Sequence, residues 1–218
     1  MMFNFKTIVT YVAVAYLLIT PGLFLYSALR RRTRRKALGV FAASRGYSFC
    51  AWPDSVLEDK QDDFELFRHA IGGWPQNHLR GNFSGNRIDV FDYRLTCSGK
   101  LRGSTIFQTV VVFTSNTRQL PHFRLRPVGL TDLIPGGHPD IDFSQAPEFS
   151  KHYHLSGTDE AQIRQAFQPS LLRQLGSNGT WFMEGHGERL LLYRQGQLVP
   201  ADKMAGFIAE TSVLASLL

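Results

Sequence analysis

The sequence lacks the motifs that mark the common catalytic and nucleotide-binding sites. In the stretch Gly81–Gly85 the serine stands one position too late for G-x-S-x-G, and no G-x-G-x-x-G is present. Gly99-Lys100 lacks the earlier glycine of a P-loop, and no H-E-x-x-H occurs. These absences favour a protein that is not an enzyme, and the sequence predicts no cofactor.

Cysteine is also scarce. Cys50 and Cys97 are the two cysteines of the chain, and neither belongs to a C-x-x-C pair. Two thiols do not make a zinc site unaided. We expect both thiols to be free in a reducing compartment, whereas an oxidising compartment would allow them to pair.

Charge is missing from one long stretch near the start. Ile8–Leu29 contains no charged residue. As a helix it would be about 33 Å long, which matches a hydrocarbon core of roughly 30 Å. A buried core helix and a cleavable signal peptide are the alternatives. The length of the stretch opposes both, and Lys6 alone precedes it as a basic side chain. The sequence therefore predicts a transmembrane helix.

A basic segment follows this stretch at once. It consists of Arg30, Arg31, Arg32, Arg34, Arg35 and Lys36. Positive charge stays on the cytoplasmic side, which predicts a single-pass protein of the plasma membrane, with its N-terminus outside and its C-terminal domain in the cytoplasm. Seven of the 24 Lys and Arg precede residue 37, so 17 remain against 18 Asp and Glu, a net charge of −1. We therefore predict that these six side chains bind anionic phospholipid headgroups at the inner leaflet, and that nucleic acid is no partner.

The fold class that this pattern indicates is α+β. The predicted layout is a short extracytoplasmic N-terminus at 1–7, the transmembrane helix at 8–29, a basic juxtamembrane block and linker helix at 30–46, and a cytosolic α+β domain at 47–218. The linker helix should end at Gly46. The domain should hold an antiparallel sheet with helices and finish in an amphipathic helix over Pro200–Leu217.

Alternating and β-branched residues place the strands. The strands predicted first are His78–Phe83, Arg87–Thr96, Ser104–Thr114 and His122–Arg126, an antiparallel meander. Thr180–Glu184 and Arg189–Tyr193 should form a second hairpin. Shorter strands are predicted at Tyr47–Phe49, Phe64–Phe67 and Lys151–Leu155, a turn at Gly72–Pro75, and helices opening at Thr158 and Ser170.

Several short phrases resemble a known family. They are Phe41–Tyr47, Val90–Arg94, Gln108–Val111, Ile141–Phe143 and Ser156–Glu160. Together they are similar to an uncharacterised bacterial, mainly actinobacterial, family of single-pass membrane-anchored proteins. The resemblance implies a membrane span followed by a cytosolic domain of unknown function. It implies no activity and no site residues.

Histidines and carboxylates gather in one stretch. The candidates for a metal site are His138, Asp140, Asp142, His152 and His154, because His152-x-His154 on a strand would place both imidazoles on one face. Ordinary polar surface residues are the alternative, and our predicted site contains no metal and no catalytic residue. Asp92 should pair with an arginine such as Arg94. Glu184 to Glu188 has acid and base residue types, but a hairpin turn explains it.

Three functions remain open. The preferred one is a non-catalytic, membrane-anchored module that binds a protein partner or lipid headgroups at the inner leaflet. The second is a membrane-associated metal-dependent hydrolase that uses the histidine and aspartate group above. The third is a structural subunit of an envelope or secretion complex. The net charge of +6 between residues 80 and 126 favours a basic sheet face, although acidic loops could balance it.

Overall fold

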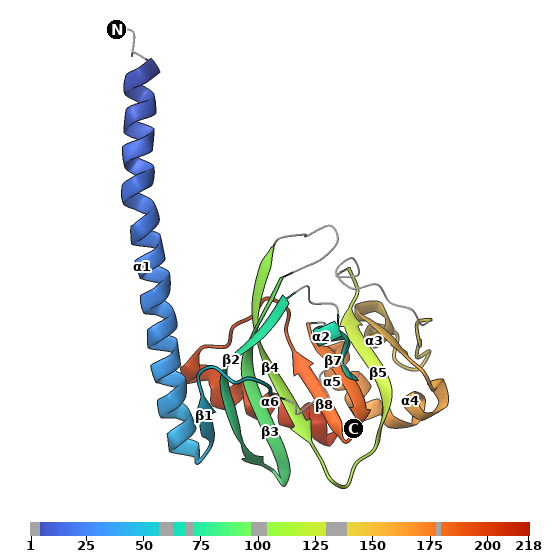
Figure 1. The fold of residues 1–218 in the computed structure, drawn as a ribbon. Coiled ribbons are helices and arrows are strands. Elements are labelled where there is room, and N and C mark those ends of the chain that lie inside the picture. Colours follow the sequence, from blue (N-terminus) through green and yellow to red (C-terminus); the bar gives the residue numbers. More distant parts are fainter. Residues whose placement is uncertain (1–4, 57–62, 69–71, 97–103, 130–138, 178–179) are drawn as a thin grey trace.

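The computed structural model describes residues 5–56, 63–68, 72–96, 104–129, 139–177 and 180–218, and these form one antiparallel sheet with helices (Figure 1). The strands are β1 (Ser48–Cys50), β2 (Gly72–Phe83), β3 (Asn86–Thr96), β4 (Thr105–Thr114), β5 (Leu120–Pro127), β6 (Tyr153–Gly157), β7 (Phe182–Gly187) and β8 (Arg189–Tyr193). The helices are α1 (Phe5–Arg45), α2 (Glu65–Arg68), α3 (Pro147–His152), α4 (Glu160–Ala166), α5 (Pro169–Gly176), the 3-10 turn η4 (Ala201–Lys203) and α6 (Met204–Ser216).

The eight strands follow the order β1-β2-β3-β4-β8-β7-β5-β6. The first four form a meander, in which β2 and β3 are a hairpin closed by Ser84 and Gly85, both with positive φ. β8 then pairs with β4, and β5 lies on the far side of β7. The predicted meander and second hairpin are thus not separate units, because the hairpin β7–β8 is inserted between β4 and β5.

The sheet buries a separate apolar cluster on each face. Ile88 and Val90 of β3 belong to the larger cluster, together with residues from α1 and from α3 through α6. Phe91 and Tyr93 point to the opposite face and pack with Phe64 and other residues around α2. This alternation follows from the two-residue period of a strand.

α1 is one helix of 41 residues, and its N-terminal part extends away from the sheet (Figure 1). Its C-terminal part packs on β1 and β2 and buries Leu38 and Ala42. It ends where predicted, at Arg45, and Gly46 follows with a φ of +68°.

The predicted transmembrane helix is wrong. Across the part of the chain that the structure describes, no helix combines the length and the apolar character needed to cross a membrane. The prediction rested on the length of Ile8–Leu29 and on its lack of charge. The single-pass topology with the N-terminus outside depended on this predicted helix and is therefore wrong. The plasma-membrane localisation derived from it is wrong for the same reason. The α+β class with an antiparallel sheet describes the remainder.

Three smaller predictions are also wrong. Phe64–Phe67 is not a strand, because Glu65–Arg68 forms the short helix α2. Gly72–Pro75 is not a turn but the start of β2, where it pairs with the far end of β3. The predicted strand at Lys151–Leu155 begins only at Tyr153, after α3 has ended. In each case tertiary contacts override a short local pattern.

Candidate functional site

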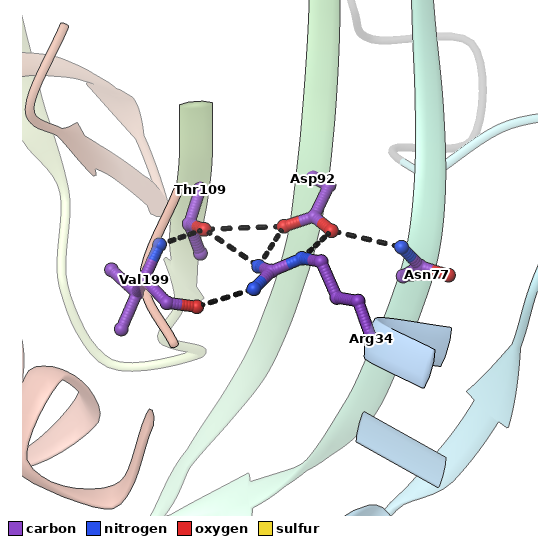
Figure 2. Close-up of polar contacts among 5 residues, drawn as sticks. All are labelled: Arg34, Asn77, Asp92, Thr109 and Val199. Carbon is purple, nitrogen blue, oxygen red and sulfur yellow. Dashed lines mark hydrogen bonds and ion pairs between the residues drawn. The ribbon is translucent and has the colours of Figure 1, made fainter. Parts of the chain in front are cut away.

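The guanidinium of Arg34 joins α1 to the sheet (Figure 2). Its Nε and Nη2 donate to the two carboxylate oxygens of Asp92 at 2.7 Å each, a bidentate pair. Its Nη1 donates to the carbonyl oxygen of Val199 at 2.7 Å. Asp92 also accepts hydrogen bonds from Asn77 at 2.8 Å and from Thr109 at 3.1 Å. The network therefore ties α1 to β2, β3, β4 and the segment before α6.

Local sequence features place each member of this network. Arg34, Leu38 and Ala42 are four residues apart, so all three face the sheet. The β2 ladder is irregular between Gln76 and Leu79, and Asn77 has a φ of +52°, which aims its amide at the carboxylate of Asp92. A fully hydrogen-bonded buried network of this kind fixes one arrangement of its elements.

An open groove of about 460 Å³ lies directly beside this network. It is lined on one side by Arg31 of α1 and on the other by Trp74, Arg94 and Phe107 of the sheet, with Trp52 also on its wall. Asp92 and Arg94 lie on the same face of β3, so the network and the groove share this face of the sheet. The groove is thus positioned by the docking of α1.

Two cations and three aromatic rings give the groove its chemical character. Trp52 and Trp74 are 58% and 57% exposed, which is unusual for tryptophan in a folded protein. The guanidinium of Arg35 stacks on Trp52 at 4.5 Å, and that of Arg94 lies 5.9 Å from the ring of Phe107. Asp54 is the acid among the lining residues. Such a surface suits a ligand that has both a negative charge and apolar area.

The apolar part of this surface continues along α1. Leu17 and Phe24 precede Arg31 at intervals of seven residues, so the three lie on nearly the same side of the helix. Both apolar side chains are largely exposed. A molecule whose charged end lay against Arg31 could therefore extend its apolar end along α1.

The helix distributes the six predicted headgroup-binding residues over different environments. Arg34 is bound inside the domain and Arg35 stacks on Trp52, whereas Arg31 lines the groove. Arg30, Arg32 and Lys36 are exposed. The six residues thus form no single surface, because neighbours on a helix differ by 100° in direction.

The stretch of histidines and aspartates is only partly brought together. His154 Nδ1 and Asp140 Oδ1 lie 3.9 Å apart, but His152 ends α3 and donates from Nδ1 to the carbonyl oxygen of Glu148 at 2.8 Å. Asp142 is exposed, and His138 lies outside the described residues. Within the described ranges no three His, Cys, Asp or Glu side chains are arranged to hold a metal ion. The expected placement of His152 and His154 on one strand face is therefore wrong.

The buried acids are engaged in structural contacts. Asp89 accepts hydrogen bonds at 2.7 Å from both His78 and Arg80. Burial acts to raise the pKa of Asp89, but these two hydrogen bonds hold it below its usual value. Glu184 accepts the backbone amides of Glu65 and Leu66 at the start of α2. Asp92 pairs with an arginine as expected, but with Arg34 rather than Arg94.

The basic stretch 80–126 does not form one face either. Arg80 and Arg87 lie beside Asp89 on one side of the sheet, and Arg94 lies on the other. Lys100 and Arg102 are outside the described residues. The groove aromatics Trp52, Trp74 and Phe107 were missed by sequence reasoning, because no short motif links positions that meet only through strand pairing.

No protein-family model matches the chain, and no curated protein matches it. Among solved structures, the crystal structure of the mycobacterial trehalose monomycolate transport factor A, TtfA, has the same fold, with a TM-score of 0.58. The two sequences are 13% identical, and the match covers 86% of this chain and 97% of that one. At this identity the likeness establishes the fold alone.

Proposed function

We propose that this chain is a non-catalytic binding protein whose groove beside α1 holds the anionic headgroup of a lipid. The observation that carries the proposal is the joint placement of Arg31 and Arg94 with three aromatic rings around one open groove. Arg31 and Arg94 would take the anionic group, and the rings would cover its apolar neighbourhood. Leu17 and Phe24 offer the adjoining apolar strip for a chain.

Two further observations support this function. Asp89, Asp92 and Glu184 are committed to hydrogen bonds that hold the fold together, which favours binding over catalysis. The protein of like fold is named as a transport factor for trehalose monomycolate. A role in lipid handling accords with that name.

The test uses the full chain and short-chain phospholipids below their critical micelle concentration. Two of the three tryptophans line the groove, so their fluorescence reports on its occupancy. We expect a phospholipid with an anionic headgroup to bind more tightly than one with a zwitterionic headgroup and the same chains. Each cation contributes about 1 kcal/mol, so the double variant Arg31→Gln/Arg94→Gln should lose affinity for the anionic lipid by about 30-fold.

Arg32→Gln is the matched control, because it removes one charge from the exposed side of the same helix turn. It should bind as the unmodified protein does. Equal affinity for the two headgroups would refute the proposal. So would an Arg32→Gln variant that loses as much affinity as Arg31→Gln, since general attraction to positive charge would then explain the binding.

A further inference from the structure

A second basic cluster lies on the opposite face of the sheet, at its other end. Arg124 and Arg126 of β5 and His154 of β6 point to the same face, because Arg126 is the register partner of His154 and Arg124 that of Ser156. Leu125 and Leu155, which alternate with them, belong to the core beneath the helices. The cluster is therefore separate from the groove beside α1, which uses the helix-covered face of β2, β3 and β4.

Both guanidiniums are buried and incompletely bonded. Arg124 and Arg126 are each 8% exposed. Arg124 Nε, Arg126 Nη1 and His154 Nδ1 are buried donors or acceptors without a hydrogen-bond partner among the described residues. A buried polar group left in this state costs about 1–3 kcal/mol, and more when it is charged. Three such groups on neighbouring side chains therefore indicate a binding site for a ligand that supplies hydrogen-bond acceptors.

The neighbouring acids do not fill this role. Neither arginine forms an ion pair within 4 Å with an acid in the described part of the chain, although Glu184 is the register partner of Arg124 on β7. The carboxylate of Glu184 is taken by the backbone amides of α2, at 2.6 and 3.2 Å. Asp140 lies 3.9 Å from His154 Nδ1 and accepts the backbone amide of Leu155 instead.

Like charge accumulates as a result. Burial, and then the charge of Arg124, lower the pKa of Arg126, whereas the charge of Asp140 acts in the opposite direction. Burial also lowers the pKa of His154. The charge of Asp140 opposes this effect, and the charges of Arg126 and Arg124 add to it. Two cations held together in a dehydrated place destabilise one another unless an anion joins them.

We propose that Arg124, Arg126 and His154 bind a phosphate group. A phosphate monoester carries up to two negative charges and three terminal oxygens, which match two guanidiniums and one imidazole. A guanidinium binds such oxygens in pairs. β6 is the edge strand of the sheet, and the side chain of His154 is 21% exposed. The ligand therefore reaches the cluster from this edge. The phosphate is either free in solution or the headgroup of a phosphomonoester lipid.

The first test measures the thermal unfolding of the full chain in inorganic phosphate, with chloride added to a constant ionic strength. Phosphate should raise the midpoint of the unmodified protein in a saturable way, and the dissociation constant from calorimetry should increase at least tenfold in Arg126→Gln. Without phosphate, Arg126→Gln should unfold at the same or a higher temperature, because it removes a buried unsatisfied charge. This second expectation separates loss of the site from loss of the fold.

Arg164→Gln is the control, because Arg164 is an exposed arginine on α4. Its phosphate response should equal that of the unmodified protein. A parallel series replaces inorganic phosphate by dihexanoyl phosphatidate, and a response to this lipid alone assigns the site to a lipid phosphate. The proposal is overturned by the absence of a response to both ligands. It is also overturned by an unchanged response in Arg126→Gln, or by equal binding of acetate, which would indicate a carboxylate site.

Discussion

At the scale of single residues, Glu184 shows how a carboxyl group that the sequence places beside a hairpin turn acquires a raised pKa through tertiary contacts. The sequence places it correctly in the second hairpin, where β7 and β8 meet at Gly187. It does not reveal that α2 covers the carboxylate, because α2 lies 118 residues earlier in the chain. Burial raises the pKa of Glu184 to about 7, although Arg124 and the Glu65 amide act in the opposite direction.

This pKa predicts a pH-dependent stability. The folded state holds the proton of Glu184 up to about pH 7, whereas the unfolded state releases it near 4.5. The contribution is therefore fully present below pH 4.5 and is lost as the pH rises through 7. A shift of this size corresponds to about 3 kcal/mol. Urea unfolding at pH 4.5 to 8 should show the free energy of unfolding falling by up to that amount relative to Glu184→Gln.

The comparison with Glu184→Gln isolates this one carboxyl. His154 and Asp89 both have lowered pKa values and change stability at acidic pH, but they do so equally in the two proteins. A constant difference between the two proteins across this pH range would show that Glu184 is ionised in the folded state throughout.

At the scale of elements, long strands were predictable and short elements were not. β3 and β4 have ten or more residues that alternate or are rich in β-branched side chains, and their positions followed from the sequence. The four residues of α2 have no such period, and their helix depends on contacts with Glu184. The groove required knowledge of how α1 docks, and α1 docks through a pair of residues 58 positions apart, Arg34 and Asp92.

The docking of α1 should depend strongly on Arg34. Arg34→Met leaves the carboxylate of Asp92 buried with only Asn77 and Thr109 as partners. Removing one member of a buried ion pair costs about 3–5 kcal/mol, so the free energy of unfolding in urea should fall by that amount.

A second variant tests the reason for this loss. Arg34→Met/Asp92→Leu removes both charges, and it should recover at least half of the stability lost in Arg34→Met. Arg32→Met changes an exposed arginine on the same helix and should stay within about 0.5 kcal/mol of the unmodified protein. A double variant less stable than either single variant would mean that packing at this site, rather than an unpaired charge, causes the loss.

At the scale of the whole molecule, the chain divides at a different place from the one its composition suggests. The charge pattern separates a neutral stretch, a basic block and a domain that starts at residue 47. In the structure α1 passes through the first two without a break, and residues from Arg34 onward contribute buried contacts to the domain. The C-terminal helix α6 was predictable because Met204, Phe207, Ile208 and Thr211, which are buried, recur with the helical period. Arg34 was not, because a charged residue next to other cations gives no sign that it is buried.

This division predicts the outcome of two truncations. Residues before Arg30 contribute no buried side chain among those that the structure describes, so a chain that begins at residue 30 should keep the free energy of unfolding of the full chain to within about 1 kcal/mol. A chain that begins at residue 37 lacks Arg34 and leaves Asp92 without its ion-pair partner. It should lose about 3–5 kcal/mol, the same loss as Arg34→Met in the full chain. Urea unfolding of the three chains and the point variant measures all four values. If the chain from residue 37 were as stable as the chain from residue 30, the folded unit would begin after the basic segment, and the groove beside α1 would lose the contact that holds its walls together.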